Sequence, residues 1–385
     1  MPEELLQLSG VVDGLGDDAI SFHINNSTDN TLHTEQLETS KIRDHETAFT
    51  QIFCALDKRL EENWTHSLIA ISHRVVHGGN RFTQPAAIDK TVIEEIRKAA
   101  TLAPLHNKIS LQAIETIQQL YPGIIQIAVF DTAFFGHLPA HAYRYALPND
   151  LYTKYNIRRY GFHGTSHQYV SDMAAKLLEK PLQKLKLITL HLGNGASAAA
   201  ILNGQCIDTS MGMSPLEGLI MGTRCGDIDP SLPFYLNREA GLEFSDIESL
   251  LNHDSGMLGL CGTKDMRDIH RLADDGNAEA CLALDMYCYR IRKYIGSYYT
   301  ILGGLDALIF TGGVGENDAR IRDTICKGLT ILGISLDQEK NLSISHEPRR
   351  IDSESGKTGV FVIPTNESLE ITRQSYSLLQ IDSRE

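Results

Sequence analysis

Short apolar segments that end abruptly in polar or glycine residues recur along this chain and constrain its fold more than any other feature. They lie at Ile124–Phe130, Lys186–Leu192, Leu305–Phe310 and Val360–Ile363. Apolar runs of this length, bounded by turn residues, are typical of buried strands. In open α/β sheets, ligands bind at the carboxyl ends of the strands. The pattern therefore predicts an α/β protein whose functional residues follow its strands.

Charge and composition exclude several classes of protein. The 385 residues include 35 Lys and Arg against 49 Asp and Glu, a formal net charge of −14 at pH 7. This acidic total argues against a nucleic-acid or polybasic membrane surface, so an anionic ligand needs local cations. No apolar stretch approaches the ~20 residues that cross a bilayer. The first residues do not resemble a secretory signal and the seven cysteines form no CxxC pair, which favours a reducing cytoplasm.

The same patterns predict the order of helices and strands. Alternation over residues 7–36 indicates antiparallel strands, and Asn203-Gly204 is a favoured two-residue hairpin, so Lys186–Thr209 is expected to form three antiparallel strands. Leu68–Ser72 is expected to be a strand that runs into a polar loop, Ser72–Gly79. Helices are expected at Asp44–Glu62, Lys90–Ala100, Asn107–Tyr121, Gln168–Leu178 with Ser166 as a possible cap, and Glu316–Leu329 after a Gly312–Gly315 turn.

Two segments combine cations with glycines. The first places Arg74 beside paired glycines, where its planar fork suits a carboxylate or phosphate; the alternative is a surface loop with ordinary ion pairs. The second, Arg158–His167, gathers arginines and histidines at a helix start, where anions bind readily. There the alternative is that the His163 ring has its hydrogen bonds satisfied within the core and that His167 is solvated. A metal site is less favoured, because no Cys or carboxylate completes a tetrahedral shell.

Two further segments suggest phosphate contacts. His191–Ser197 brings a strand into a tight Gly-Asn-Gly turn that exposes backbone N–H groups, without a Walker or GxGxxG motif. Ordinary hairpin chemistry explains the same residues. Met221–Pro230 sets Arg224 between glycines, where it could act as an arginine finger in phosphoryl transfer. A turn ion pair between Arg224 and Asp227 or Asp229 is the alternative.

A nucleotide and a cation have candidate sites as well. Thr311–Asn317 is a strand-turn-helix joint that could seat a nucleotide, although close strand-helix packing alone would also require its glycines. Asp131 and Glu367 are carboxylates at strand tips, and Mg²⁺ usually binds one or two carboxylates plus substrate phosphates. Either carboxylate alone is otherwise a helix cap or a loop salt bridge.

Taken together and in this order, the six segments closely resemble the acetate kinase family over nearly the whole chain. The resemblance implies the actin-like ATPase fold of the sugar kinase, heat-shock 70 and actin superfamily, with two ribonuclease H-like α/β domains around a central cleft. The implied N-terminal domain covers residues 1–133 plus 370–385, and the implied C-terminal nucleotide-binding domain covers 134–369. The implied activity is reversible, in-line phosphoryl transfer from ATP to acetate, giving acetyl phosphate and ADP with Mg²⁺ or Mn²⁺. A cytoplasmic homodimer that serves acetyl-CoA biosynthesis is implied too.

The resemblance also implies a role for each matching residue. Asp131, His163 and Arg224 would be catalytic, and the last two would stabilise the transferring phosphoryl group. Acetate or acetyl phosphate would be bound by Arg74, Val76, Leu105, His106, Phe162 and Pro215. ATP would be bound by His191, Leu192, Gly193, Asn194 and Gly195, by Asp265, Met266 and Arg267, and by Gly313, Val314, Gly315, Glu316 and Asn317. Glu367 would ligate Mg²⁺.

The beginning of the chain departs from the family pattern. Members of the family start with a strand that leads into Asn-x-Gly-Ser-Ser-Ser-x-Lys, and nothing similar precedes Leu8–Val11. Roughly twenty residues are expected to be missing, and loss of their strand would leave neighbouring sheet edges unpaired. One alternative to acetate kinase activity is therefore a nucleotide-binding homologue with little turnover. Propionate kinase, and a sugar kinase or chaperone-like ATPase of the same superfamily, are separate alternatives.

Overall fold

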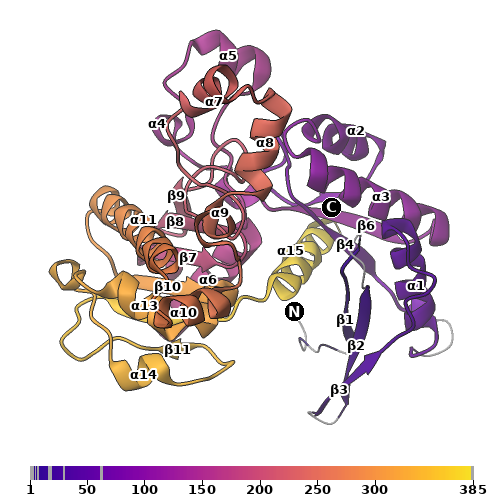
Figure 1. Cartoon of the computed structure of the whole chain (residues 1–385). Coiled ribbons are helices and arrows are strands. Elements are labelled where there is room, and N and C mark those ends of the chain that lie inside the picture. Colours follow the sequence, from indigo (N-terminus) through magenta and orange to yellow (C-terminus); the bar gives the residue numbers. More distant parts are fainter. Residues whose placement is uncertain are drawn as a thin grey trace. The chain divides into compact units, whose positions relative to one another are not determined.

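The computed structural model describes residues 4, 6, 8–15, 20–28, 31–60 and 64–382 of the chain (Figure 1). These residues form two compact units. Unit 1 holds the described residues of Met1–His77, Pro85–Val129 and Ile371–Glu385, and unit 2 holds Gly78–Gln84 and Phe130–Glu370. Residues far apart in the sequence therefore contribute to each unit.

Unit 1 begins with three antiparallel strands, which confirms the prediction for the described residues of 7–36. They are β1 (Leu8–Asp13), β2 (Ser21–Thr28) and β3 (Thr31–Gln36), followed by helix α1 (His45–Asp57). On β2, Phe22 and Ile24 alternate with more exposed residues and form a core with α1. The N-terminus of α1 is fixed by Asp44, whose carboxylate accepts a hydrogen bond from the Thr47 N–H at 2.8 Å. The helix ends at Asp57, and its predicted end, Glu62, lies outside the described residues.

The second sheet of unit 1 has the order β4-β6-β5. The elements that build this part are β4 (Ala70–Val75), β5 (Ala86–Ala87), β6 (Ile125–Phe130), α2 (Lys90–Ala99), α3 (Pro104–Leu120), a short 3-10 helix at Trp64–His66 and the unit 1 part of α15 (Glu367–Asp382). Helix α3 packs against α1, α2 and β4. It starts at Pro104, earlier than the predicted Asn107, because proline suits the first turn of a helix.

Strand β4 starts and ends later than the predicted Leu68–Ser72, which corrects the expected loop at Ser72–Gly79. The strand continues through Val75, so His73 and Arg74 are strand residues. Alternation explains the extension, because His73 and Val75 are buried whereas Arg74 is exposed. A polar His73 is tolerated there because its Nε2 lies 2.7 Å from Gln126 Oε1 on β6.

Unit 2 is built on a sheet of order β11-β12-β10-β7-β8-β9. Its strands are β7 (Lys186–Leu192), β8 (Ala196–Leu202), β9 (Gln205–Thr209), β10 (Ala307–Thr311), β11 (Arg349–Arg350) and β12 (Gly359–Val362). The first three are antiparallel, as predicted, and Asn203 and Gly204 join β8 to β9 with φ of 54° and 84°. Strands β10 and β12 then pair in parallel with the β7 side. Three antiparallel strands extended by parallel ones form the sheet of a ribonuclease H-like domain.

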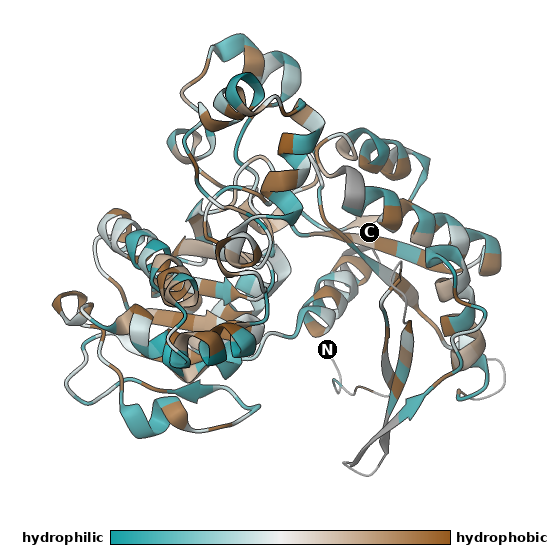
Figure 2. Cartoon of the chain, in the orientation of Figure 1, coloured by the Kyte–Doolittle hydropathy of each residue, from teal (hydrophilic) through white to brown (hydrophobic). Residues whose placement is uncertain are grey.

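Helices cover both faces of this sheet. Nearly every residue of β7, β8 and β10 is buried, and α6 (Gly164–Leu177) and α11 (Ala278–Leu302) both pack against β7. The other helices of unit 2 are α4 (Ala140–Tyr143), α5 (Asn149–Tyr155), α7 (Leu232–Ala240), α8 (Phe244–His253), α9 (Gly256–Cys261), α10 (Met266–Asp274), α12 (Gly312–Asn317), α13 (Ala319–Cys326) and α14 (Gln338–Leu342). Short 3-10 helices lie at Ala133–Phe135, Leu182–Lys184 and Thr330–Leu332. Figure 2 shows helices that carry both hydrophilic and hydrophobic residues, as amphipathic helices that cover a sheet do.

Helix α6 starts earlier than predicted, so Ser166 is not its cap. The N-cap is His163, which holds the left-handed φ of 60°, and Ser166 lies inside the first turn. The chain can begin the helix there because Gly164 has no side chain: a Cβ at this position would lie 2.1 Å from the Asp131 carbonyl oxygen. The Gly164 N–H donates to that same oxygen at 3.0 Å.

The segment after β10 also differs from the prediction. The expected Gly312–Gly315 turn is the first turn of α12, and the expected helix Glu316–Leu329 is split at Asp318, which caps α13 through the Ile321 N–H. Gly312 makes the direct passage from strand to helix possible, because its φ is 76° and a Cβ there would lie 2.7 Å from the Leu192 carbonyl oxygen.

Within the described ranges, every helix is too short or too polar to span a bilayer. All seven cysteines lie in those ranges and are unpaired.

Unit 1 contains a histidine that should make stability depend on pH. Burial lowers the pKa of His73 from 6.5 to about 4. The folded chain keeps His73 neutral, so the pKa of His73 is lower in the folded than in the unfolded chain. The stability linked to neutral His73 is therefore complete above pH 6.5 and is lost as the pH falls from 6.5 toward 4. We expect the free energy of unfolding to fall by about 2–3 kcal/mol between about pH 7 and pH 4.5 through this group. Urea unfolding at the two pH values measures the decline.

His73→Gln removes the titrating ring and should make that decline shallower. His66→Gln is the matched control, since His66 is exposed and should leave the decline unchanged. Equal slopes for His73→Gln and the unmodified chain would contradict this assignment.

Candidate functional site

The carboxyl ends of three neighbouring strands bring the singled-out segments of unit 2 together. His191 of β7 is paired with Thr311 of β10, and β12 lies on the other side of β10. The Gly193-Asn194-Gly195 turn follows β7, α12 follows β10, and Pro364–Glu367 follows β12. Parallel strands present their carboxyl ends at one edge of a sheet, so these segments share that edge.

Two stacked imidazoles lie beside the turn. The rings of His163 and His191 are 4.3 Å apart, at an angle of 27°. A hydroxyl holds Nδ1 of each ring: Ser197 Oγ lies 2.9 Å from His163 Nδ1, and Ser166 Oγ lies 2.8 Å from His191 Nδ1. Both Nε2 atoms are near the turn. A Cβ at Gly195 would lie 3.2 Å from His163 Nε2, and a Cβ at Gly193 would lie 3.9 Å from His191 Nε2. Each ring therefore presents one nitrogen to the turn.

Arg224 approaches the same point from a different loop. The loop between β9 and α7 carries it, and its Nη1 donates to the Pro215 carbonyl at 3.2 Å. Nη1 also lies 3.7 Å from the position of a Gly195 Cβ, so Arg224 and His163 both reach within 4 Å of one point. Burial lowers the pKa of Arg224. A half-buried cation of this kind is suited to an incoming anion.

The ion pair weighed as the alternative for Arg224 is not formed. No carboxylate in the described part of the chain pairs with Arg224, and burial alone accounts for its pKa shift. Asp227 instead accepts a hydrogen bond from the Tyr294 hydroxyl at 2.8 Å and pairs with Arg290 at 3.4 Å. The alternative of a turn ion pair is therefore wrong.

A partly buried network holds the loop that carries Arg224. Arg159 Nη1 donates to the carbonyls of Thr209, Ser210 and Met211, and the other nitrogen pairs with Glu217. The Arg158 guanidinium lies 3.9 Å above the Tyr143 ring. The two arginines that the sequence placed near an anion therefore have structural roles. Of that segment, His163 is the member at the turn.

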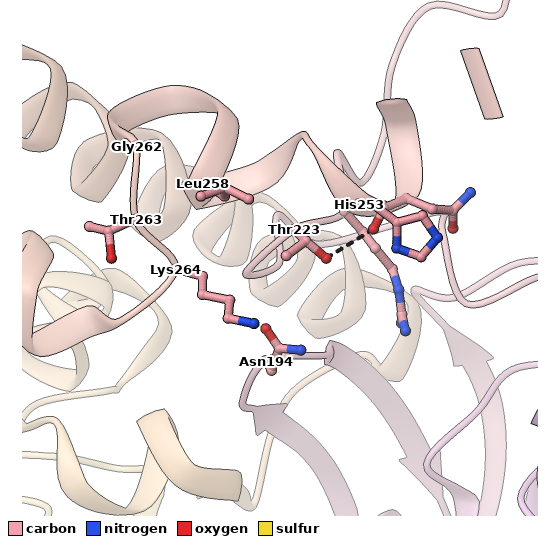
Figure 3. Close-up of a pocket in the computed structure, with 9 residues that line it drawn as sticks. Asn194, Thr223, His253, Leu258, Gly262, Thr263 and Lys264 are labelled. Carbon is pink, nitrogen blue, oxygen red and sulfur yellow. Dashed lines mark hydrogen bonds between the residues drawn. The ribbon is translucent and has the colours of Figure 1, made fainter. Parts of the chain in front are cut away.

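A cavity of about 590 Å³ opens next to Arg224 (Figure 3). It is lined by Asn194, Thr223, Arg224, Asn252, His253, Leu258, Gly262, Thr263 and Lys264. Figure 3 shows the Lys264 ammonium pointing toward the Asn194 side chain. None of the lining residues is acidic, so the cavity suits an anionic group.

Sequence reasoning missed most of the residues around this cavity. Lys264 could have been found, because it directly precedes the singled-out Asp265-Met266-Arg267. Thr223 lies within the predicted segment Met221–Pro230, whereas Asn252, His253 and Thr263 carry no sequence signal. Asp265 caps α10 through the Arg267 N–H at 2.9 Å, and the two side chains also pair with each other. Met266 is the first residue of that helix.

The two predicted carboxylates come together around one hydroxyl. Thr165 Oγ1 donates to Glu367 Oε2 at 3.1 Å and lies 3.4 Å from Asp131 Oδ1. Asp131 is fully buried. Carboxylate and hydroxyl oxygens fit Mg²⁺, which prefers hard oxygen ligands. No group of three or more His, Cys, Asp or Glu side chains gathers within the described residues, so a bound cation would need substrate oxygens as further ligands.

Glu316 ties the first turn of α12 to the segment that follows β12. Glu316 Oε1 accepts hydrogen bonds from the Gly312 N–H at 2.9 Å and the Thr365 N–H at 3.1 Å. The Asn317 amide donates back to the Gly313 carbonyl at 2.9 Å. Both side chains thus shape the turn, and the exposed backbone of Gly313 is left facing outward. Within the same segments, Leu192 and Gly315 are buried and Val314 is half-buried.

The remaining predicted residues are distributed over both units. In unit 2, Phe162 is buried and Pro215 accepts the Arg224 hydrogen bond. In unit 1, Arg74 lies on β4 and its carbonyl accepts from the Ser110 hydroxyl at 3.2 Å, and Val76 is buried directly after that strand. His106 and Leu105 belong to α3, and the Leu105 side chain lies outside what the structure describes.

A ribonuclease H-like sheet with a glycine turn at its strand tips, and with two histidines and an arginine beside that turn, is typical of an α/β protein of the actin-like ATPase fold. A family model for the Acetokinase family matches residues 3–373. The chain belongs to this family, which confirms the resemblance and the predicted fold class.

Similar proteins agree with this placement. The chain is 51% identical over 338 residues to the acetate kinase of Sulfurovum sp. (strain NBC37-1), covering 88% of this chain and 85% of that protein. It is 46% identical over 380 residues to the acetate kinase of Syntrophobacter fumaroxidans (strain DSM 10017 / MPOB), covering 97% and 91%.

Two solved structures are similar over almost their whole length. The crystal structure of Porphyromonas gingivalis acetate kinase is 39% identical with a TM-score of 0.89, covering 98% of this chain and 95% of that one. That of a propionate kinase from Francisella tularensis subsp. tularensis SCHU S4 is also 39% identical, with a TM-score of 0.87 and coverage of 96% and 92%.

Gly195 offers a direct test of how closely the site is packed. A Cβ there would lie 3.2 Å from the His163 ring and 3.7 Å from Arg224 Nη1, so Gly195→Ala should push both groups apart. We expect turnover to fall about 10- to 100-fold, because small misplacements of reacting groups have effects of this size. Steady-state kinetics measure the loss.

Gly296→Ala is the matched control, since Gly296 is a helical glycine of unit 2 with open space around its Cβ position. It should leave turnover unchanged. Unchanged turnover in Gly195→Ala as well would show that the turn does not contact the reacting groups.

Proposed function

We propose that this chain catalyses the reversible transfer of the γ-phosphoryl group of ATP to acetate, giving acetyl phosphate and ADP. Family membership and the names of its relatives support this activity. The single observation that carries it is the approach of His163 Nε2 and Arg224 Nη1 to one point beside Gly195. Two donors at one point, one of them a cation without a carboxylate partner in the described residues, suit a phosphoryl group in transfer.

The proposed mechanism is direct in-line transfer. The transferring group is metaphosphate-like, so its equatorial oxygens need charge and hydrogen-bond donors around them rather than a covalent nucleophile. Arg224 and His163 provide these donors, and the backbone of Gly193–Gly195 holds nucleotide phosphates. Asp131 orients the acyl group or a cation, because acetate is already ionised at neutral pH.

The remaining site residues extend this proposal. His191–Gly195, Asp265–Arg267 and Gly313–Asn317 would bind ATP, with Glu316 acting through the shape of its turn. The acetate or acetyl phosphate would be bound by Arg74, Val76, Leu105, His106, Phe162 and Pro215. Glu367 would hold Mg²⁺, or Mn²⁺, and the ion would neutralise charge on the phosphate oxygens. The Thr165 contact to Glu367 supports this role because it orients the carboxylate.

Domain organisation, assembly and location belong to the same proposal. The two proposed ribonuclease H-like domains, with boundaries at 133/134 and 369/370, would correspond to units 1 and 2 except for residues 78–84, 130–133 and 370, which belong to unit 2. The resemblance to the acetate kinase family supports a homodimer in the cytoplasm that serves acetyl-CoA biosynthesis.

Propionate is the closest competing substrate. The high structural similarity to a propionate kinase supports propionate as a second candidate substrate. One methylene in an apolar pocket discriminates only about 10- to 200-fold, so acetate and propionate must be compared directly.

Trapping of the acyl phosphate tests the activity. The chain, ATP, Mg²⁺ and acetate are incubated with hydroxylamine, and hydroxamate formation is expected. Propionate, run in parallel, should give a lower kcat/KM. ATP binding without hydroxamate from either acid would replace the proposal with a nucleotide-binding protein, and ATP use that depends on a sugar or peptide would replace it with another kinase or ATPase.

Arg224→Gln tests the proposed phosphoryl contact. An arginine finger is worth about 10³- to 10⁵-fold in rate, so the variant should lose turnover by about that factor. Its thermal unfolding should change little, because in the described part of the chain the guanidinium donates one long hydrogen bond to the Pro215 carbonyl and one weak one to Met221 Sδ.

Arg238→Gln is the matched control, an exposed arginine on α7. It should retain full turnover. Near-normal turnover in Arg224→Gln would reject the role of Arg224 while leaving the overall activity to the trapping assay.

A further inference from the structure

Four side chains form a continuous hydrogen-bonded line beside the Gly193-Asn194-Gly195 turn. Thr189 Oγ1 of β7 lies 2.7 Å from His167 Nδ1 of α6. His167 Nε2 lies 2.7 Å from Ser197 Oγ of β8, and Ser197 Oγ lies 2.9 Å from His163 Nδ1. The line therefore runs from the interior of unit 2 to the imidazole beside Gly195.

The interior members of this line are cut off from solvent. Thr189, His167 and Ser197 each have no exposed surface. Burial lowers the pKa of His167 well below 6.5, so its ring is neutral and carries a single proton. Each member of the line must therefore donate in one direction and accept from the other.

Thr189 decides which direction the protons point. Among the described residues, His167 Nδ1 is the hydrogen-bond partner of its hydroxyl. A buried donor without an acceptor is strongly disfavoured, so the Thr189 proton must point to His167 Nδ1. The single proton of His167 then sits on Nε2 and is donated to Ser197 Oγ.

The last two links follow from the first. Since Ser197 Oγ accepts from His167, its own proton is donated to His163 Nδ1. A neutral His163 must then carry its proton on Nε2, the nitrogen that lies 3.2 Å from the Gly195 Cβ position. If every hydrogen bond of the line were donated in the opposite direction, the buried Thr189 proton would have no acceptor.

We propose that Thr189, His167 and Ser197 are positioning residues that hold neutral His163 as the Nε2–H tautomer, so that it donates a hydrogen bond to an oxygen of the transferring phosphoryl group. The catalytic part of this inference rests on the proposed function. A bare Nε2 would instead present a lone pair to an anionic oxygen, which is repulsive. His191 is not part of the line, because Ser166 holds its Nδ1.

The tautomer can be observed directly in the full chain. Two-bond ¹H–¹⁵N spectra of ¹⁵N-histidine-labelled protein at about pH 8, above the usual histidine pKa, distinguish the protonated ring nitrogen. The His163 signals are assigned by their loss in His163→Gln. We expect Nε2–H for His163 in the unmodified chain, and an Nδ1–H form would overturn the proposal.

Thr189→Val removes the hydroxyl while keeping the branched shape. The direction of hydrogen-bond donation along the line is then no longer fixed, so His163 should populate both tautomers. We expect kcat to fall about 10-fold while KM for ATP stays unchanged. Thr189→Ser should restore both the tautomer and kcat. An unchanged His163 spectrum in Thr189→Val would overturn the role of Thr189, and if this variant does not fold, the spectrum of the unmodified chain still decides the tautomer.

Ser171→Ala is the matched control for a lost hydroxyl. Ser171 is as buried as Thr189 and lies on α6, but it donates to the His167 carbonyl rather than to the ring. Its removal should leave the His163 tautomer and kcat unchanged, and an equal loss in Ser171→Ala and Thr189→Val would overturn the proposal. Because the spectra do not depend on turnover, an Nε2–H form in a chain without hydroxamate formation would reject the proposed function and leave the tautomer assignment standing.

Discussion

The site depends on the positive charge of the half-buried Arg224 guanidinium. Its charge is not neutralised by any carboxylate in the described part of the chain, yet burial opposes that charge. Such a group is tolerated because an anion can complete it and because its loop is held rigidly. Arg159 holds the start of that loop through three carbonyls and Glu217, so one arginine fixes the backbone that carries the other.

The histidines show a complementary arrangement. His163 and His191 stack at the turn, and a serine fixes one nitrogen of each ring. These hydroxyls come from α6 and β8, elements that already pack against β7 for hydrophobic reasons. The core that stabilises unit 2 therefore also orients the polar groups at its edge.

Local sequence patterns predicted most elements of the fold and failed where one contact outweighed them. His73 was assigned to a loop because it is polar, but Gln126 on the neighbouring strand satisfies it and β4 continues. Ser166 was a plausible helix cap, but Gly164 packs against the Asp131 carbonyl and moves the start of α6 back. The glycine turn after β10 is helical, because Gly312 can approach the Leu192 carbonyl. In each case the deciding partner is distant in the sequence.

Local patterns were enough to predict the class of fold and the family, because strand-length apolar runs, turn dipeptides and motif order can all be read along the chain. It also singled out His163, Arg224 and the Gly193–Gly195 turn as separate candidates. The three-dimensional arrangement was needed to see that these three meet at one point, that Arg159 is structural, and that Asp131 and Glu367 share a hydroxyl. The reason is that strand pairing converts a separation of tens of residues into a few ångströms, and no periodicity along the chain records which strands will be neighbours.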